Sequence, residues 1–364
     1  MQILSTLFVA IITGYLSFTN SLAYFLMDTL PFIDNPLREH SVQTLSVDPV
    51  ELPSSYDPDR GIPDILLRNL RYQSAVVIDG LPVDHSYTTD PTEALVNILC
   101  TYTTDQFMRT TTGTGFFINP DGVILTNAHV AQFLLLETVT DRGTTECIIR
   151  TGDPAVPAYR AELLYIPPSW IQAHARSISD IMPTGTGERD YALLYVRESI
   201  GSEPLPATFP TLKIDTELVP RSTINHIVYA AGYPAQQAFV ADRNTPLVPQ
   251  VASTSVSTLY TFGSNFADLM ALRGSRIGEH GSSGGPVLNE AGAVIGMIST
   301  RGNDQVDGSG SLRAITLSYV DRTITEETGF SLARNASGNL PFRAQLFKET
   351  LAPFLTTILA RELQ

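Results

Sequence analysis

Three separate stretches of the chain carry side chains that can cooperate in hydrolysis. The first runs from Gly281 to Pro286, where three glycines surround Ser282 and Ser283 directly ahead of an apolar run at residues 293–299. Glycine lets the backbone approach a ligand closely and aim successive N–H groups at one point, as an oxyanion hole requires. Alone, the cluster is equally ordinary loop material, so its interpretation depends on partners elsewhere.

The other two stretches supply a histidine and an aspartate. The turn signal at residues 119–122 joins two apolar runs, which places His129 just beyond the end of the second strand. Asp190 heads the apolar run of residues 191–196, and a carboxylate there can hold an imidazole in one tautomer and stabilise the imidazolium. Taken singly, His129 is typical of a plain polar residue and Asp190 of a strand-start residue. Their joint occurrence with Ser283 favours a Ser-His-Asp triad.

These stretches resemble a known family. Residues 126–129 (TNAH), 190–194 (DYALL) and 281–286 (GSSGGP), in that order, resemble the three signature blocks of trypsin/chymotrypsin-like serine proteases, over about residues 93–320. The resemblance implies that His129 is the general base, Asp190 its orienting acid and Ser283 the nucleophile of a serine endopeptidase. It also implies an oxyanion hole from the backbone N–H groups of Gly281 and Ser283, and a fold of two perpendicular six-stranded β-barrels with the active site in the cleft between them.

The chain departs from the digestive members of this family. They carry an acid immediately before the nucleophile, but here Ser282 stands there, so activation by a newly cut N-terminus is not expected. The chain is more similar to the bacterial and envelope-associated branch. Ile277 occupies the position at the base of the primary pocket, which predicts a small or aliphatic preference rather than Arg or Lys. Three residues match the family's substrate-binding wall and are expected to offer a strand edge to which an extended peptide binds: Ser299, Thr300 and Arg301.

Two groups of short apolar runs separated by turn signals surround these residues, and they predict an all-β protein with two β-domains side by side. We place the first domain, carrying His129 and Asp190, at residues 92–205, and the second, carrying Ser283, at 206–340. Residues 341–364 have apolar residues at helical intervals and predict a C-terminal helix bent near Pro353. The second barrel is expected to use most of the residues after Ser283, which leaves no room for an appended PDZ module.

The N-terminal part predicts export. Residues 1–23 read as a signal peptide cleaved before Tyr24, or as the start of an uncleaved membrane anchor within residues 3–27, because the run is nearly continuously apolar but lacks a basic residue ahead of it. Residues 24–91 are rich in Pro and Asp and predict an extended segment. Either alternative places the body outside the cytoplasm: secreted, periplasmic or membrane-tethered.

Composition narrows the partners. The 37 acidic and 23 basic residues give a net charge of −14, which would repel a nucleic acid over most of the surface. The partner we expect is a polypeptide substrate, with no metal or organic cofactor. The two cysteines, Cys100 and Cys147, lack metal-site spacing; in an oxidising compartment they form a disulfide, or they are two isolated buried thiols.

Two other functions compete with this interpretation. The pattern Gly281-x-Ser283-x-Gly285 also fits the nucleophile elbow of α/β-hydrolases, but that chemistry needs a histidine after the serine, and His280 is the last one. The alternative kept is a catalytically inactive binding protein on the protease fold. Residues 335–337 (NAS) also match a glycosylation acceptor.

Overall fold

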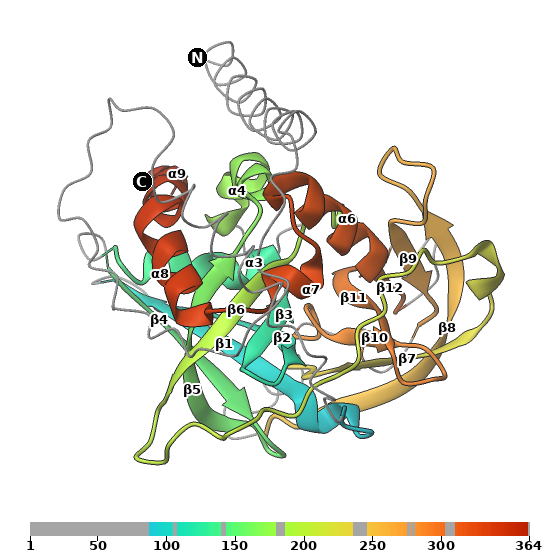
Figure 1. Ribbon diagram of the computed structural model, residues 1–364, viewed down its shortest axis with the longest axis horizontal. Helices are drawn as coiled ribbons and strands as arrows, with labels where there is room; N and C mark the ends of the chain where they lie inside the picture. The colour runs from blue at the N-terminus through green and yellow to red at the C-terminus, as the bar shows by residue number, and fades with distance from the viewer. Residues whose placement is uncertain are drawn as a thin grey trace, which may run out of the picture. The chain divides into compact units, whose positions relative to one another are not determined.

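Two closed antiparallel β-barrels of six strands each form the body of the protein (Figure 1). The computed structural model describes residues 87–104, 108–139, 143–179, 186–235, 246–274, 277, 281–302 and 310–362. Within these residues the predicted fold class is confirmed. The predicted export segment, and the Pro- and Asp-rich extension up to residue 86, lie outside the described residues.

The first barrel closes in the order β1-β2-β3-β6-β5-β4. Its strands are β1 (Leu95–Thr103), β2 (Met108–Asn119), β3 (Val123–Thr126), β4 (Thr144–Thr151), β5 (Val156–Tyr165) and β6 (Ala192–Ser199). The predicted turn joins β2 to β3: the Asn119 side chain accepts a hydrogen bond from the Asp121 N–H, and Gly122 has a φ of 90° that favours glycine. All four residues of β3 are buried, so the strand that leads to His129 is fixed in the barrel core.

The second barrel closes in the order β10-β11-β12-β9-β8-β7. Its strands are β7 (Ile227–Gly232), β8 (Gln250–Tyr260), β9 (Leu269–Leu272), β10 (Pro286–Leu288), β11 (Val294–Arg301) and β12 (Leu312–Thr316). Strand β11 is buried from Val294 to Ser299 and pairs with β10 on one side and β12 on the other. The loop that carries Ser283 leads directly into β10, which is held against β11 in the barrel wall.

Among the described residues, short helices precede or connect the strands, and four further helices follow the last strand. They are η1 (Pro91–Ala94), α3 (Ala128–Ala131), η2 (Gln132–Leu136), α4 (Pro168–His174), η3 (Ala175–Ser179), η4 (Arg221–Thr223), α6 (Leu317–Thr328), α7 (Leu332–Asn335), α8 (Leu340–Thr350) and α9 (Ala352–Glu362). The predicted C-terminal helix is in fact the pair α8 and α9, separated at Leu351, with Pro353 in the first turn of α9, where its missing N–H costs no helical hydrogen bond. In the described part of the chain, no helix has both the length and the apolar character needed to cross a membrane.

The C-terminal helices pack on the first barrel. Helix α8 lies on β5, and α9 lies on η2, where the Thr356 hydroxyl donates to the Leu135 carbonyl at 2.9 Å. Leu355 and Leu359 of α9 belong to the hydrophobic cluster of the first barrel. The end of the chain thus supports the helical turn that follows His129.

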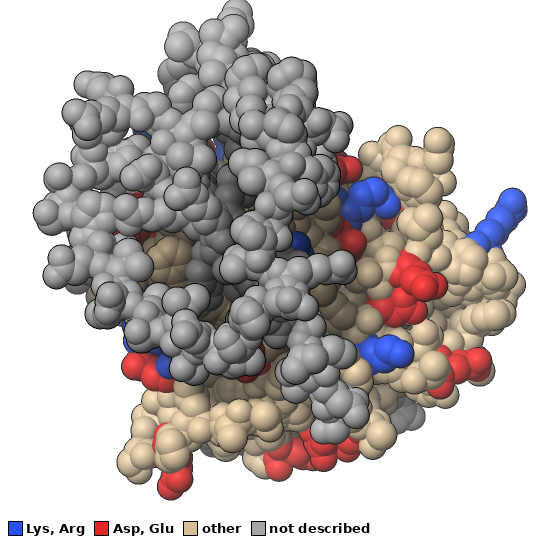
Figure 2. Space-filling view, in the orientation of Figure 1, with Lys and Arg blue, Asp and Glu red and all other residues tan. Residues whose placement is uncertain are grey.

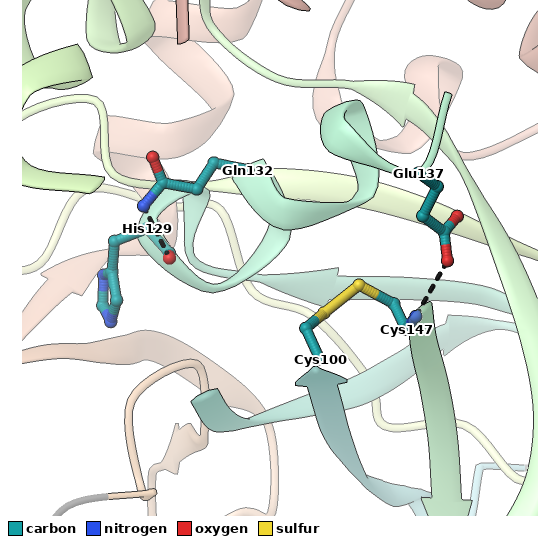
Figure 3. The surroundings of a disulfide bond; sticks show 5 residues. All are labelled: Cys100, His129, Gln132, Glu137 and Cys147. Carbon is teal, nitrogen blue, oxygen red and sulfur yellow. Dashed lines mark hydrogen bonds between the residues drawn. A yellow bond between two sulfur atoms is a disulfide. The ribbon is translucent and has the colours of Figure 1, made fainter. Parts of the chain in front are cut away.

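The alternative left open for the cysteines is resolved by a Cys100–Cys147 disulfide. The two residues are direct partners in the register of β1 and β4, and both are buried (Figure 3). The Cys147 N–H donates to the Glu137 carboxylate at 2.8 Å, just past the end of η2. The disulfide, β4 and the His129 helix are therefore parts of one connected region.

Replacing both cysteines by alanine is expected to lower the free energy of unfolding by about 2–4 kcal/mol, because the bond closes a long loop that the unfolded chain would otherwise leave free. Chemical denaturation of the double variant and the oxidised wild type measures the difference. A reduced wild type that is as stable as the oxidised protein would contradict the prediction.

Asn335, the asparagine of the glycosylation motif, has a structural role in the folded protein. Its side chain is buried, and its amide nitrogen donates to Thr328 Oγ1, to Phe330 O and to Ser331 O. Its amide oxygen accepts a hydrogen bond from Arg343 at 3.0 Å. This asparagine joins α6, α7 and α8 and is inaccessible to a glycosyl group.

Candidate active site

His129 and Asp190 form the central contact of the site. His129 lies in α3, two residues after the N-cap residue Asn127, and its Nδ1 is 2.8 Å from Asp190 Oδ2. The His129 backbone N–H donates to Asp190 Oδ1 at 3.0 Å, so one carboxylate holds both the ring and its main chain. The Asn127 side chain donates to the Asp190 carbonyl at 2.8 Å. The carboxylate is 4% exposed and the imidazole 24%, so the histidine presents its outer edge to solvent.

Charge pairing outweighs burial at both residues. Burial lowers the pKa of His129, but the Asp190 charge and hydrogen bond raise it more, and the pKa ends above its ordinary value. Burial raises the pKa of Asp190, but the charge of His129 and the hydrogen bonds from His129 and Ser299 leave it below its ordinary value. The carboxylate therefore stays ionised and holds the proton on Nδ1, which leaves Nε2 as the nitrogen that can accept a proton.

The loop before Asp190 is held by α6. Arg189 has a φ of 55°, and its N–H donates to the Tyr319 hydroxyl at 3.1 Å. Its guanidinium pairs with the carboxylate of Glu327, which also accepts hydrogen bonds from Tyr165 and Ser169 of the first barrel. A helix that follows the last strand of the second barrel therefore fixes the aspartate loop of the first.

Ser299 connects Asp190 to Ser283. The register of β11 against β12 shifts between Ile298 and Thr300, which sets Ser299 out of the regular pairing. Its hydroxyl donates to Asp190 Oδ2 at 2.6 Å, and its carbonyl accepts from the Ser283 hydroxyl at 3.4 Å. Among the described residues, Ser283 thus bonds Ser299 rather than the His129 ring. Sequence reasoning placed Ser299 on the substrate wall and missed its bond to Asp190.

The glycines around Ser283 are required by close packing. A Cβ on Gly284 would lie 1.9 Å from the Thr114 carbonyl oxygen, and one on Gly285 would lie 2.1 Å from the Ala231 carbonyl oxygen. Gly284 donates to Ile298 O at 2.7 Å, which ties the loop to β11, and Gly285 donates to Ser282 O at 2.9 Å, which closes the turn itself. Gly281, with a φ of 99°, begins this turn, and the predicted oxyanion donors at 281 and 283 lie on either side of the buried Ser282.

The remaining predicted residues lie at different depths. Ile277 is fully buried in the hydrophobic cluster of the second barrel, together with Leu312 and Ala314. Thr300 is half-buried and Arg301 exposed, at the end of β11. Strand β10 begins at Pro286, which lies opposite Met297 of β11, whereas β12 pairs with β11 as far as Arg301. The last residues of β11 therefore extend beyond β10.

Gly113 and Val130 pack the His129 helix against β2. A Cβ on Gly113 would lie 2.5 Å and 2.7 Å from the two γ carbons of Val130, the residue after His129. Gly113→Ala is therefore expected to lower the free energy of unfolding by about 1–3 kcal/mol, as overpacking in a core does. Thermal or chemical unfolding measures this loss.

The matched test removes the obstacle. Val130→Ala is expected to cost less in the Gly113→Ala background than in the wild type, because it makes room for the added methyl group. Equal costs in the two backgrounds would show that the two side chains do not compete for this space.

Comparisons with known proteins find a matching family model and similar solved structures. The family model described as the trypsin-like peptidase domain matches residues 113–297, slightly more than half of the chain. The chain is similar to the Rv3671c protease from M. tuberculosis in its active form, with 19% identity, a TM-score of 0.40, and coverage of 79% of this chain and 94% of the other. The chain is also similar to the inactive form of a serine-to-alanine mutant of that protein, with 18% identity, a TM-score of 0.40, and coverage of 66% of this chain and 88% of the other. No curated protein sequence matches the chain.

Proposed function

This chain belongs to the trypsin-like peptidase family, and from that premise we propose that it is a serine endopeptidase with Ser283 as nucleophile. The observation that carries the proposal is the hydrogen-bonded series from His129 through Asp190 and Ser299 to Ser283. It joins a base, a buried carboxylate and a hydroxyl drawn from both barrels. The proposal requires that the Ser283 hydroxyl exchange its hydrogen bond to the Ser299 carbonyl for one to the His129 imidazole.

In the proposed reaction, Ser283 Oγ attacks the peptide carbonyl while His129 Nε2 takes the hydroxyl proton. The same nitrogen returns that proton to the leaving amine, and water then hydrolyses the acyl-enzyme with His129 again as base. Asp190 stabilises the imidazolium in both steps. The N–H groups of Gly281 and Ser283 receive the negative charge on the carbonyl oxygen, and losing one such donor costs about 3 kcal/mol of barrier.

We propose that the substrate is an extended polypeptide added as a strand beside Ser299, Thr300 and Arg301. The extension of β11 beyond the end of β10 supports this proposal. Ile277, at the sequence position that matches the base of the family's primary pocket, is apolar and not acidic, which supports a small or aliphatic side chain at the cleaved bond. Among the described residues on the face seen in Figure 2, acidic and basic side chains are interspersed over a mainly neutral surface, and together with the net charge of −14 this favours a polypeptide over a nucleic acid.

We also propose that the catalytic body works outside the cytoplasm. The Cys100–Cys147 disulfide supports this location, because such bonds persist in oxidising compartments. Whether residues 3–27 are removed or tether the protein to a membrane decides between a secreted and an anchored enzyme. Fractionation of the producing cells and the N-terminal sequence of the mature protein distinguish the two.

Incubation of the purified full-length protein with a mixed peptide library tests the proposed activity. We expect cleavage at internal bonds after small or aliphatic residues, abolished by prior treatment with a fluorophosphonate. Comparable cleavage after Arg and after Ala or Val would refute the specificity. A protein that binds peptides but cuts none would instead be the inactive binding protein.

A further inference from the structure

Thr114 of β2 joins the first barrel to the loop that carries Ser283. Its hydroxyl donates to the Gly281 carbonyl at 2.7 Å, and its backbone N–H donates to the Ser283 carbonyl at 2.7 Å. Its own carbonyl accepts from the Thr126 hydroxyl at 2.7 Å, just before the His129 helix. One buried residue therefore contacts both ends of the Gly281–Ser283 segment and the strand that leads to the histidine.

The same hydroxyl also holds a third segment. It accepts from the Tyr233 N–H at 2.9 Å, directly after β7. Gly281 packs on this segment so closely that a Cβ there would lie 2.6 Å from the Tyr233 carbonyl oxygen. The Thr114 hydroxyl thus donates to one backbone group and accepts from another, and both belong to the second barrel.

Gly281 needs such support because of its conformation. Its φ of 99° lies where glycine is free to rotate and other residues rarely go. The neighbouring Ser282 hydroxyl is buried and has no hydrogen-bond partner among the described residues, so the Gly281 carbonyl is held by Thr114 and not by the side chain beside it. Anchoring this carbonyl resists rotation about the two backbone bonds of Gly281, and such a rotation would change the direction of the Gly281 N–H.

We propose that Thr114 is a positioning residue that holds the Gly281 N–H in the orientation of an oxyanion-hole donor. The inference rests on the proposed serine endopeptidase function. Without the hydroxyl, the Gly281 carbonyl and the Tyr233 N–H both lose a partner, and the glycine is free to turn its N–H away from the substrate carbonyl. The loss falls on the transition state, because the oxyanion exists only there.

Kinetics of Thr114→Val and Thr114→Ser on the best-cleaved library peptide test the proposal. We expect Thr114→Val to lower kcat about 10- to 100-fold while KM changes less than about threefold, since an interaction made only in the transition state lowers kcat and kcat/KM together. Inhibition by a peptide boronic acid, whose adduct mimics the oxyanion, should weaken by the same factor. Thr114→Ser, which keeps the hydroxyl, should stay within about threefold of the wild type for kcat.

Thr328→Val is the matched control for stability. The Thr328 hydroxyl likewise donates to a carbonyl, that of Ile324, and accepts from a backbone N–H, that of Phe330, but it lies at the end of α6. Thr328→Val should lower the melting temperature about as much as Thr114→Val does, but kcat and the affinity for the boronic acid should stay at their wild-type values. A Thr114→Val enzyme with wild-type kcat, or one whose boronic acid affinity is unchanged, overturns the proposal.

Two further outcomes are decided in advance. If Thr114→Val does not fold, Thr114→Ala is measured in the same way, and if neither folds while Thr328→Val does, the hydroxyl is structural and the proposal is overturned. Failure of the proposed function gives a different result: the Ser283→Ala variant would then cleave the peptide as fast as the wild type does. In a chain that Ser283→Ala silences, a normal Thr114→Val enzyme refutes only the role of Thr114.

Discussion

Ser283→Ala is expected to lower kcat for peptide hydrolysis about 10⁴- to 10⁶-fold, because it removes the nucleophile and with it the acyl-enzyme route. His129→Ala should cost nearly as much, and the double variant little more than either, since the two groups act in one step. The folded state should survive the serine change, because within the described residues the Ser283 hydroxyl makes a single hydrogen bond, to the Ser299 carbonyl at 3.4 Å. Steady-state kinetics on a library-derived peptide, with a melting curve for each variant, measure these effects.

Ser282→Ala is the matched control for that variant. Ser282 is the adjacent residue and is fully buried, and its hydroxyl has no partner within the described residues. Its removal should leave kcat within a few-fold of the wild type. Activity that is lost in Ser282→Ala and kept in Ser283→Ala would show that Ser282, and not Ser283, is the nucleophile.

Asp190→Asn is expected to lower kcat about 10⁴-fold, because the amide no longer holds the proton on His129 Nδ1 and the ring takes the wrong tautomer. It should also change the pH profile. Activity needs neutral His129, whose pKa Asp190 holds above its ordinary value, so wild-type activity should be lost as the pH falls through that raised pKa. Without the negative charge, burial dominates and lowers the pKa of His129, so the acid limb should move to lower pH.

A pH profile of kcat/KM for the wild type, Asp190→Asn and Ser299→Ala checks this assignment. Ser299→Ala removes one hydrogen bond to the carboxylate but keeps its charge, so it should cost less activity and move the acid limb less. An acid limb that stays in place in Asp190→Asn would show that another group controls it.

The sequence predicted most strands because each is an apolar run between turn signals. Strand β9 (Leu269–Leu272) could not be predicted, because it is only four residues long and all four are buried, so it lacks the alternation of apolar and polar residues that marks a strand. In sequence, residues 312–320 (LRAITLSYV) form one unbroken β-prone run, but the structure divides them between β12 and the start of helix α6. Its start depends on Thr316, whose hydroxyl accepts from the Tyr319 N–H and caps the helix, which is a local signal that strand propensity hid.

The three proposed catalytic side chains could be predicted because each sits in a short local motif. The residues that connect them could not, because their contacts arise only when the barrels fold. Ser299 reaches Asp190 through the register shift in β11, and Thr114 reaches Gly281 across the two barrels. A serine at the end of an apolar strand and a threonine between two glycines carry no sign of such partners in sequence.

The site of modification by a fluorophosphonate probe tests the central claim most directly. We expect mass spectrometry of the labelled full-length protein to find the phosphonate on Ser283 alone, and His129→Ala to slow the labelling at least about 100-fold, since general base catalysis contributes 10²–10⁴-fold. A label on another residue, or a labelling rate that is the same without the imidazole, would contradict the account.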